Sequence, residues 1–479
     1  MVQMKFLRGF SDHKSWRDIM ALLHKVNNYL VFAITGLVIF SQTVFSNEDL
    51  NTLQRNANDL ANGGTFLLSK SCEIDGTLLF KNKSNITING NNLTITQLKQ
   101  NTITIKIMDC NNVKVGNLVL IGDPGSYIPT KQTDSVGIYM LRCKGQHVFE
   151  GIKFYDHGFA GFEAVNVSNI TIDRCLFNAE KVNVKDNEIY NCGISSYGTK
   201  SHGINMENWE IKNCLFEKTA IGIILDLGHD HLNLHDNKFT DMRGQHGMYL
   251  NASSYVNIYD NTFTNIFGSA VKLQMNNGYD EDETDITIIN NTCNVEQSHN
   301  RAQAGFQVGV AKPQGPAKGV SWKNVRIENN RANRCDYGVA VSCATDANIS
   351  HNELSDSVYG VLASSYSGCI CDNNITNTQW SGILCEVMTG RTVDIEGNVI
   401  KGPVHISEGD AYRRCGIFLT GSGIVELENN RMYKNEGHPL YGLYQGQNIT
   451  LTRYNNNRLI GPLELKGPVV SQANNEILR

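Results

Sequence analysis

Polar and titratable side chains recur at fixed positions within short alternating runs that begin with glycine or another small residue, in the middle of the chain. Runs such as GIIL from Gly222 and GMYL from Gly247 alternate in the manner of a β-strand. The first and third residues after each glycine are apolar and are expected to point inward, so the second and fourth point to solvent. The outward residues expected on this face are Tyr139, Glu163, Glu207, Asp226, Tyr249, Asn251, Lys272, Gln274 and Gln307. Strands stack about 4.8 Å apart, so the residues from Glu207 to Lys272 should share a strip about 15 Å long.

Elimination from a uronic acid needs three groups in such a strip. A cation offsets the carboxylate, a base takes the proton next to it, and an acid protonates the leaving oxygen. Arg243 or Lys272 would supply the cation, and His246 or Tyr249 the base and the acid. The candidates for substrate binding are Glu163, His202, Asn251, Gln274 and Gln307.

Hydrolysis of a glycosidic bond would instead need two carboxylates. Their separation is about 5.5 Å for retention and about 6.5–9.5 Å for inversion. Glu207 with Asp226, or Asp226 with Asp241, would meet this on neighbouring strands. A protein that only binds sugars would favour exposed aromatic rings, and only Tyr139 and Tyr249 qualify among the expected outward residues.

Metal binding is weakly indicated. Asp280, Asp282 and Asp285 offer the oxygen ligands that calcium prefers, although a solvated acidic loop is the favoured interpretation. His229 and His231 alternate faces on a strand, so a shared metal would require a loop there. The thirteen cysteines form no paired CxxC motif, which argues against structural zinc, and most are expected to be small buried residues. Calcium is therefore the one cofactor candidate.

Composition narrows the class of protein. The 479 residues are 41% hydrophobic and 19% charged, which excludes a disordered chain. The formal net charge of −5 argues against a nucleic-acid partner.

A repeat explains how these residues would be positioned. The template apolar-x-x-Asn-x-apolar recurs at shortest intervals of 21 to 25 residues, and Cys175 and Cys214 occupy its asparagine position in two further copies. Its asparagines are Asn237, Asn261, Asn291, Asn330, Asn352, Asn373, Asn398, Asn430 and Asn457. The longer intervals carry extra residues, interpreted as loops that wall a groove. The missing Leu-x-x-Leu-x-Leu signature excludes leucine-rich repeats, and the short interval excludes propeller blades, which need about 40 residues.

This repeat resembles the right-handed parallel β-helix of pectate lyases and phage tailspikes. The resemblance covers roughly residues 63 to 465 and implies an all-β, single-stranded solenoid of about 12 coils, with stacked asparagines at one turn. Residues 47–62 are expected to form a helix that caps the first coil, and residues 63–479 the β-helix itself. The tailspike resemblance also implies a homotrimer.

The amino terminus predicts export. The apolar run at residues 30–45 is short for a membrane-spanning helix but suits a signal sequence. Residues 1–46 are therefore interpreted as a signal peptide or signal-anchor, with Met20 as an alternative start. Either interpretation places the rest of the chain outside the cytoplasm, and this segment is its one expected membrane contact.

These observations lead to one expected function and two alternatives. The leading hypothesis is an exported polysaccharide lyase or uronate epimerase, with a glycoside hydrolase on the same scaffold as the first alternative. The second is a non-catalytic β-helix that binds carbohydrate or assists envelope assembly. The site is expected on the outward face between Glu207 and Gln307, centred on Tyr249.

Overall fold

The computed structural model describes most of the chain beyond the expected export signal. It describes residues 50–122, 135–184, 190–197, 206–226, 228–275, 282–297, 299–310, 321–402, 415–433 and 441–478. The chain divides into Met1–Asn47 and Glu48–Arg479, and the described residues belong to the second unit. The predicted signal segment, including Met20, lies outside the described residues.

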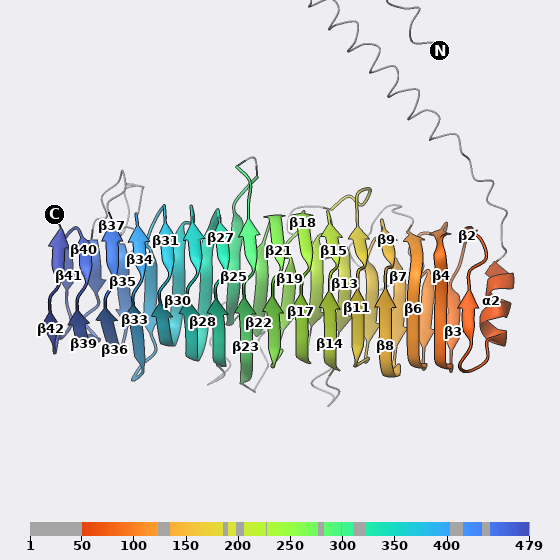
Figure 1. Cartoon of the computed structure of the whole chain (residues 1–479), viewed down its shortest axis with the longest axis horizontal. Coiled ribbons are helices and arrows are strands. Elements are labelled where there is room, and N and C mark those ends of the chain that lie inside the picture. Colours follow the sequence, from red (N-terminus) through yellow and green to blue (C-terminus); the bar gives the residue numbers. More distant parts are fainter. Residues whose placement is uncertain are drawn as a thin grey trace, which may run out of the picture. The chain divides into compact units, whose positions relative to one another are not determined.

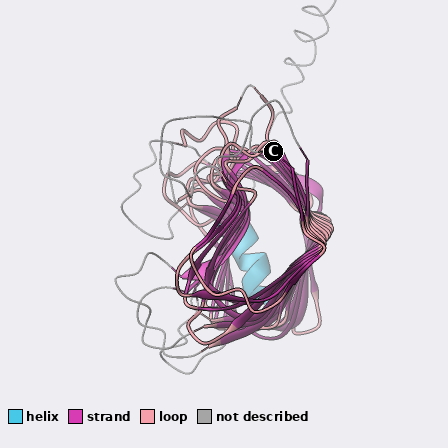
Figure 2. Cartoon of the chain, turned by 90° about the vertical axis from the view of Figure 1, so that its left-hand side faces the viewer, coloured by secondary structure: helices cyan, strands magenta, loops and turns pink. Residues whose placement is uncertain are grey.

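The second unit is a parallel β-helix in which each coil contributes one short strand to each of three faces (Figures 1 and 2). The first face contains β3 (Leu78–Lys81), β5 (Ile105–Met108), β7 (Val136–Leu141), β10 (Ala160–Val165), β13 (Cys192–Tyr197), β16 (Ile221–Asp226), β19 (Met248–Asn251), β22 (Ser269–Met275), β25 (Ala302–Val310), β32 (Ile383–Val387), β35 (Cys415–Gly421), β38 (Tyr441–Gln445) and β41 (Leu463–Leu465).

The second face follows the first along every coil. It contains β1 (Thr65–Leu67), β8 (Lys144–Glu150), β11 (Ile170–Asp173), β14 (Met206–Lys212), β17 (His229–His235), β20 (Val256–Tyr259), β23 (Glu283–Ile289), β26 (Trp322–Glu328), β33 (Thr392–Glu396), β36 (Gly423–Glu428), β39 (Ile449–Asn455) and β42 (Gln472–Ala473).

The third face closes the coil. It contains β2 (Cys72–Ile74), β9 (Lys153–Tyr155), β12 (Leu176–Asn178), β15 (Leu215–Glu217), β18 (Lys238–Met242), β21 (Thr262–Ile266), β24 (Thr292–Asn294), β27 (Arg331–Asn333), β29 (Glu353–Ser355), β31 (Asn374–Thr376), β34 (Val399–Lys401), β37 (Arg431–Tyr433), β40 (Arg458–Ile460) and β43 (Glu476–Leu478). Four long strands bend across two faces: β4 (Ser84–Gln97) and β6 (Asn111–Ile121) join the second to the third, and β28 (Cys335–Ser350) and β30 (Tyr359–Cys371) join the first to the second.

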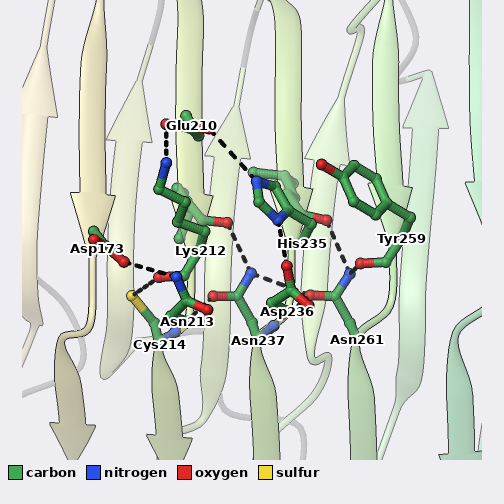
Figure 3. Close-up of polar contacts among 12 residues, drawn as sticks. Asp173, Glu210, Lys212, Asn213, Cys214, His235, Asp236, Asn237, Tyr259 and Asn261 are labelled. Atoms are coloured by element: carbon green, nitrogen blue, oxygen red, sulfur yellow. Dashed lines mark hydrogen bonds and ion pairs between the residues drawn. The ribbon is translucent and has the colours of Figure 1, made fainter.

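The repeated asparagines form a ladder at the turn between the second and third faces (Figure 3). Asn261 Oδ1 accepts a hydrogen bond from the Asn237 backbone N–H at 3.0 Å, and Asn261 Nδ2 donates to the Leu234 carbonyl at 2.9 Å. Cys214 continues the ladder, because its N–H donates to Asn237 Oδ1 and its sulfur accepts from the Cys175 N–H. The predicted repeat and its cysteine variants are therefore confirmed.

Stacked side chains fill the interior. Five phenylalanine rings from the third face lie in a row with neighbouring centroids 4.6 to 4.8 Å apart, and all are buried. They are Phe154, Phe177, Phe216, Phe239 and Phe263. Ten of the eleven described cysteines outside the disulfide are also buried, as expected for small apolar residues, while Cys369 and Cys371 form a disulfide that the sequence did not indicate.

The helix expected within residues 47–62 is α2 (Leu50–Asp59), which covers the first coil (Figure 1). Leu53 and Ala57 are buried against the coil. Gln54 pairs with the exposed backbone edge: its Nε2 donates to the Leu79 carbonyl and its Oε1 accepts from the Leu79 N–H, both at 2.8 Å. The helix thus satisfies groups of an open strand edge that would otherwise invite pairing with another chain.

Candidate functional site

The register of the first face places Tyr249 and Lys272 directly opposite each other on adjacent coils. Gln307 follows Lys272 on the next coil. We call the outward residues of this region the outer strip. It consists of Glu163, Ser195, Tyr197, Asp226, Tyr249, Asn251, Lys272, Gln274 and Gln307.

Lys272 lies beside the face of the Tyr249 ring. Its Nζ is 5.7 Å from the ring centroid, within the range of a cation–π contact. Burial lowers the pKa of Lys272, because removal from water disfavours the charged ammonium. On the next coil Gln307 Oε1 accepts a hydrogen bond from Ser269 Oγ at 3.1 Å. The Tyr249 phenol and the Lys272 amine, whose pKa is lowered, therefore lie on neighbouring coils.

His246 supports Tyr249 from below. Its ring is 4% exposed and lies nearly parallel to the Tyr249 ring, with 5.7 Å between centroids. Its Nδ1 accepts a hydrogen bond from the Ser269 N–H at 2.9 Å. Burial, with a smaller contribution from the charge of Lys272, lowers the pKa of His246 to about 3. The imidazole is therefore neutral at physiological pH with its proton on Nε2, which suits a positioning group better than a base.

Glu163 faces outward as the alternation predicts, but it is completely buried. The expectation that it is exposed to solvent is therefore wrong. A small apolar cluster separate from the main core includes Phe159 and Ile224, and Tyr139 and Tyr197 pack against it. The pKa of Tyr197 is raised by burial first and then by neighbouring groups that include Asp226 and Glu163. The neighbours of Glu163 on the adjacent coils are Tyr139 and Ser195, and the sequence of its own strand does not predict them.

Asp226 and Asn251 continue the outer strip at its edge toward the second face. Asn251 Nδ2 donates a hydrogen bond to Asp226 Oδ1, and Asn251 is fully buried. Gln274 is paired with Asn251 on the following coil. Asp226 and Gln274 are half-buried and can hydrogen-bond sugar hydroxyls beside the Tyr249 and Lys272 pair, whereas the buried Asn251 can only orient Asp226.

The predicted position of Glu207 in the strip is wrong. It lies on β14, which pairs with β11 and β17 of the second face, so it is opposite Asp230 rather than Asp226. Its backbone N–H donates to Ser168 Oγ at 3.1 Å. The alternation around Glu207 identified a strand but could not say on which side of the turn it lies. His202, which precedes it, lies outside the described residues.

Neither carboxylate pair proposed for hydrolysis lies on one face. Glu207 belongs to the second face, Asp226 to the first, and Asp241 to β18 of the third. The two carboxylates of each pair therefore do not occupy equivalent outward positions on neighbouring coils. The expected separation between the carboxylates depended on such positions.

A pocket of about 450 Å³ opens at the turns that lead from the third face into β19 and β22. Arg243 lines this pocket and none of the outer-strip residues does, so the structure separates Arg243 from Tyr249 and Lys272. Its lining includes Lys218, Asp241, Arg243, Asn265, Phe267 and His299.

The acidic residues considered for calcium are engaged with protein groups. Asp282 forms an ion pair with Lys323 and accepts from the Ser321 N–H at 2.7 Å, and Lys323 chiefly lowers the pKa of Asp282. Asp285 accepts hydrogen bonds from Asn324 and Thr284. Asp280 lies outside the described residues.

The two strand histidines considered for a metal also differ in environment. His229 is buried with its Nε2 2.9 Å from Ser196 Oγ, whereas His231 is exposed and stacks on Tyr255. Across the described ranges, no three His, Cys, Asp or Glu side chains come together as a metal site would require.

Four buried histidines predict a loss of stability in acid. Burial lowers the pKa of His147 and His157 to about 4 and that of His229 and His246 to about 3. In the unfolded chain histidine has a pKa near about 6.5, so the unfolded state binds more protons as the pH falls below that value. The free energy of unfolding should therefore decrease from about pH 6.5 toward pH 4, by several kcal/mol in sum.

Urea denaturation at a series of pH values measures this effect. His229→Met removes one titrating group while Ser196 Oγ keeps its hydrogen bond to the Ala164 carbonyl, so the pH slope should become shallower. An unfolding free energy that stays constant between pH 7 and pH 4 would contradict the expectation.

Two family models match the chain. Residues 130–311 match the right-handed β-helix region, and residues 275–461 match the periplasmic copper-binding protein NosD. No curated protein matches the sequence. Among the described residues, no helix has the length and apolar character needed to cross a membrane.

Solved structures of similar architecture share little sequence with the chain. An exopolygalacturonase from Thermotoga maritima is 13% identical, with 80% of this chain and 87% of that chain covered and a TM-score of 0.46. The A-module of mannuronan C-5 epimerase AlgE6 from Azotobacter vinelandii is 12% identical, with 92% and 98% covered and a TM-score of 0.43. The polygalacturonase of Erwinia carotovora is 11% identical, with 86% and 95% covered and a TM-score of 0.33.

The described part of residues 275–461 does not fit a copper site. Copper favours clustered thiolate, thioether and imidazole ligands. Cys293 and Cys335 have their sulfur atoms 3.9 Å apart in the core, and no His, Cys, Asp or Glu joins them as a third ligand within the described ranges. His351 is exposed and lies 3.7 Å from the Asp372 carboxylate. Copper therefore has no role in the proposed reaction.

Proposed function

We propose that this parallel β-helix protein is an exported enzyme acting on a uronate-containing polysaccharide. The proposed reaction begins with removal of the proton next to the uronate carboxylate. Elimination and epimerisation share this step. They differ in whether the glycosidic oxygen then leaves or the proton returns to the opposite side of the sugar.

The juxtaposition of Tyr249 and Lys272 is the observation that supports this proposal. Lys272 is the cation of the outer strip that lies beside the phenol, and it is the group proposed to offset the carboxylate of the bound uronate. Tyr249 is the proposed proton-transfer residue, because the Nδ1 lone pair of His246 already accepts the hydrogen bond from the Ser269 N–H. The His246 ring stacked against Tyr249 would fix the direction of the phenol.

In the proposed elimination, Tyr249 in its phenolate form takes the proton from C5 as the C4–O bond breaks. The electron pair of the C–H bond becomes the new C4–C5 double bond. The phenol then gives its proton to the departing sugar oxygen, so no other reagent is consumed. In epimerisation the C4–O bond stays intact. A water molecule on the opposite face gives C5 its new proton, and the proton held by the Tyr249 phenol neutralises the resulting hydroxide. Asp226, oriented by the hydrogen bond from Asn251, is positioned to hydrogen-bond sugar hydroxyls during either course.

The protein is proposed to act outside the cytoplasm. The apolar run at residues 30–45 and the match to a periplasmic family both support a location outside the cytoplasm. The polysaccharide is the proposed partner, and membrane contact is proposed only through the N-terminal segment. The homotrimer implied by the tailspike resemblance stays a prediction.

One alternative has structural support of its own. Tyr139 and Tyr197 join Tyr249 as partly buried aromatic side chains on the same face, which suits the binding of sugar without turnover. A carbohydrate-binding β-helix is therefore the second candidate function.

A panel of uronate polymers separates these functions. Each polymer is incubated with the protein and followed by ultraviolet absorbance of unsaturated products, by new reducing ends and by NMR of the uronate configuration. Absorbance supports elimination, and a change in configuration supports epimerisation. Reducing ends without absorbance would indicate hydrolysis, and binding with no product would overturn the enzymatic proposal in favour of a binding protein.

A further inference from the structure

The pocket beside the outer strip contains an arginine without a carboxylate partner in the described parts of the chain. Lys218 is paired with Glu180, and His299 Nδ1 lies 3.9 Å from Glu296. No described carboxylate lies within 4 Å of the Arg243 guanidinium, although its charge contributes to lowering the pKa of Glu180 after the larger effect of Lys218. A guanidinium can donate two parallel hydrogen bonds to a carboxylate.

The other groups of the pocket match the rest of an acidic sugar. Asp241 Oδ1 accepts a hydrogen bond from Asn265 Nδ2 at 3.0 Å, and no described residue donates to Asp241 Oδ2. Asn300 adds an amide and Phe267 an apolar ring. Sugar hydroxyls can pair with the carboxylate and the amide, while the C–H face of the sugar packs on the ring. The volume of about 450 Å³ falls within the usual range for small-ligand sites, about 300–1,000 Å³.

The pocket lies at the turns that precede the strands proposed to carry the chemistry, and the six residues from Arg243 to Tyr249 span at most about 20 Å. Arg243 precedes Tyr249 by six residues, and Phe267 precedes Lys272 by five. A polymer on the outer strip can therefore place a neighbouring residue or a side branch in the pocket.

We infer that this pocket binds a second carboxylate-bearing sugar residue of the substrate, with Arg243 as the residue that recognises the carboxylate. The inference rests on the proposed function for the identity of the polymer. It adds that the substrate carries at least two acidic residues, one reacting beside Tyr249 and one held by Arg243. Arg243 is thus a specificity-determining residue and not the cation that acts at the reacting sugar.

Calorimetric titration with defined tetramers tests this inference. The probes are the tetramers of galacturonate and mannuronate, together with the same tetramers after reduction of their carboxyl groups to alcohols. The wild-type protein should bind at least one acidic tetramer about 10- to 100-fold more tightly than its reduced form, as expected for a charged hydrogen-bonded pair. Arg243→Met should weaken binding of the acidic tetramer by a similar factor and leave that of the reduced tetramer unchanged.

Lys238→Met is the matched control. Lys238 is an exposed cation on β18, the strand that ends one residue before Arg243, and it does not line the pocket, so its loss should leave both affinities unchanged. Arg243→Lys keeps the charge and should retain part of the preference for the acid. Circular dichroism of each variant checks that the fold is intact.

The failure of this inference is distinguishable from failure of the proposed function. Equal affinity of the wild-type protein and Arg243→Met for the acidic tetramers, or no preference for acid over alcohol, would overturn the inference. A loss of binding in Arg243→Met with full turnover in Tyr249→Phe would keep the pocket and reject the proposed chemistry.

Discussion

Tyr249→Phe is expected to lower turnover of a uronate polymer by about 10²- to 10⁴-fold, the usual contribution of a positioned acid or base. The substitution removes one oxygen and keeps the ring that stacks on His246 and faces Lys272. Binding of the polymer and the thermal midpoint should therefore change little. The measurement is the initial rate with the polymer that responds in the panel, at saturating concentration.

Ser364→Ala provides the control on the same face. Ser364 lies on β30, four coils beyond Tyr249, and its hydroxyl contacts Glu386 rather than any residue of the outer strip. Its removal should leave turnover unchanged. Wild-type turnover in Tyr249→Phe, or an equal loss in Ser364→Ala, would show that the chemistry lies elsewhere.

Asn261→Ala is expected to lower the free energy of unfolding by about 2–5 kcal/mol, because a buried polar group left without its partner costs about 1–3 kcal/mol. Asn261 Oδ1 accepts from both the backbone and the side chain of Asn237, and its Nδ2 donates to the Leu234 carbonyl. All of these groups lose that partner in the alanine variant. Urea denaturation measures the change.

Asn257→Ala on the same coil is the matched control. Asn257 is exposed on β20, and no hydrogen bond to its side chain is present among the described residues. Its substitution should change stability by less than about 0.5 kcal/mol. Similar losses in the two variants would mean that the ladder contributes no more than any surface asparagine.

The fold was accessible from the sequence because its determinants repeat. Each coil carries the same apolar alternation and an asparagine at the same turn, so errors in one copy are corrected by the next. The copies with cysteine in place of asparagine also fit the repeat. In the structure the Cys214 sulfur accepts a backbone hydrogen bond from the preceding coil, as the asparagines do.

The candidate site was only partly accessible because it depends on contacts between coils. Tyr249 and Lys272 were expected to be neighbours from alternation alone, and the register agrees. The face occupied by Glu207, by contrast, depends on where the chain turns, and the burial of Glu163 depends on neighbours from adjacent coils such as Tyr139. The positioning role of His246 follows from its hydrogen bond to Ser269, which no local pattern specifies.

Release of tritium from C5 of a labelled uronate polymer tests the central claim most directly. Elimination and epimerisation both break the C5–H bond, whereas hydrolysis and binding leave it intact. With the polymer that responds in the panel, we expect tritium to pass into water with the wild-type protein and with Ser364→Ala, and to do so about 10²- to 10⁴-fold more slowly with Tyr249→Phe. Product formation without tritium release, or release at the wild-type rate in Tyr249→Phe, would contradict proton removal by this residue.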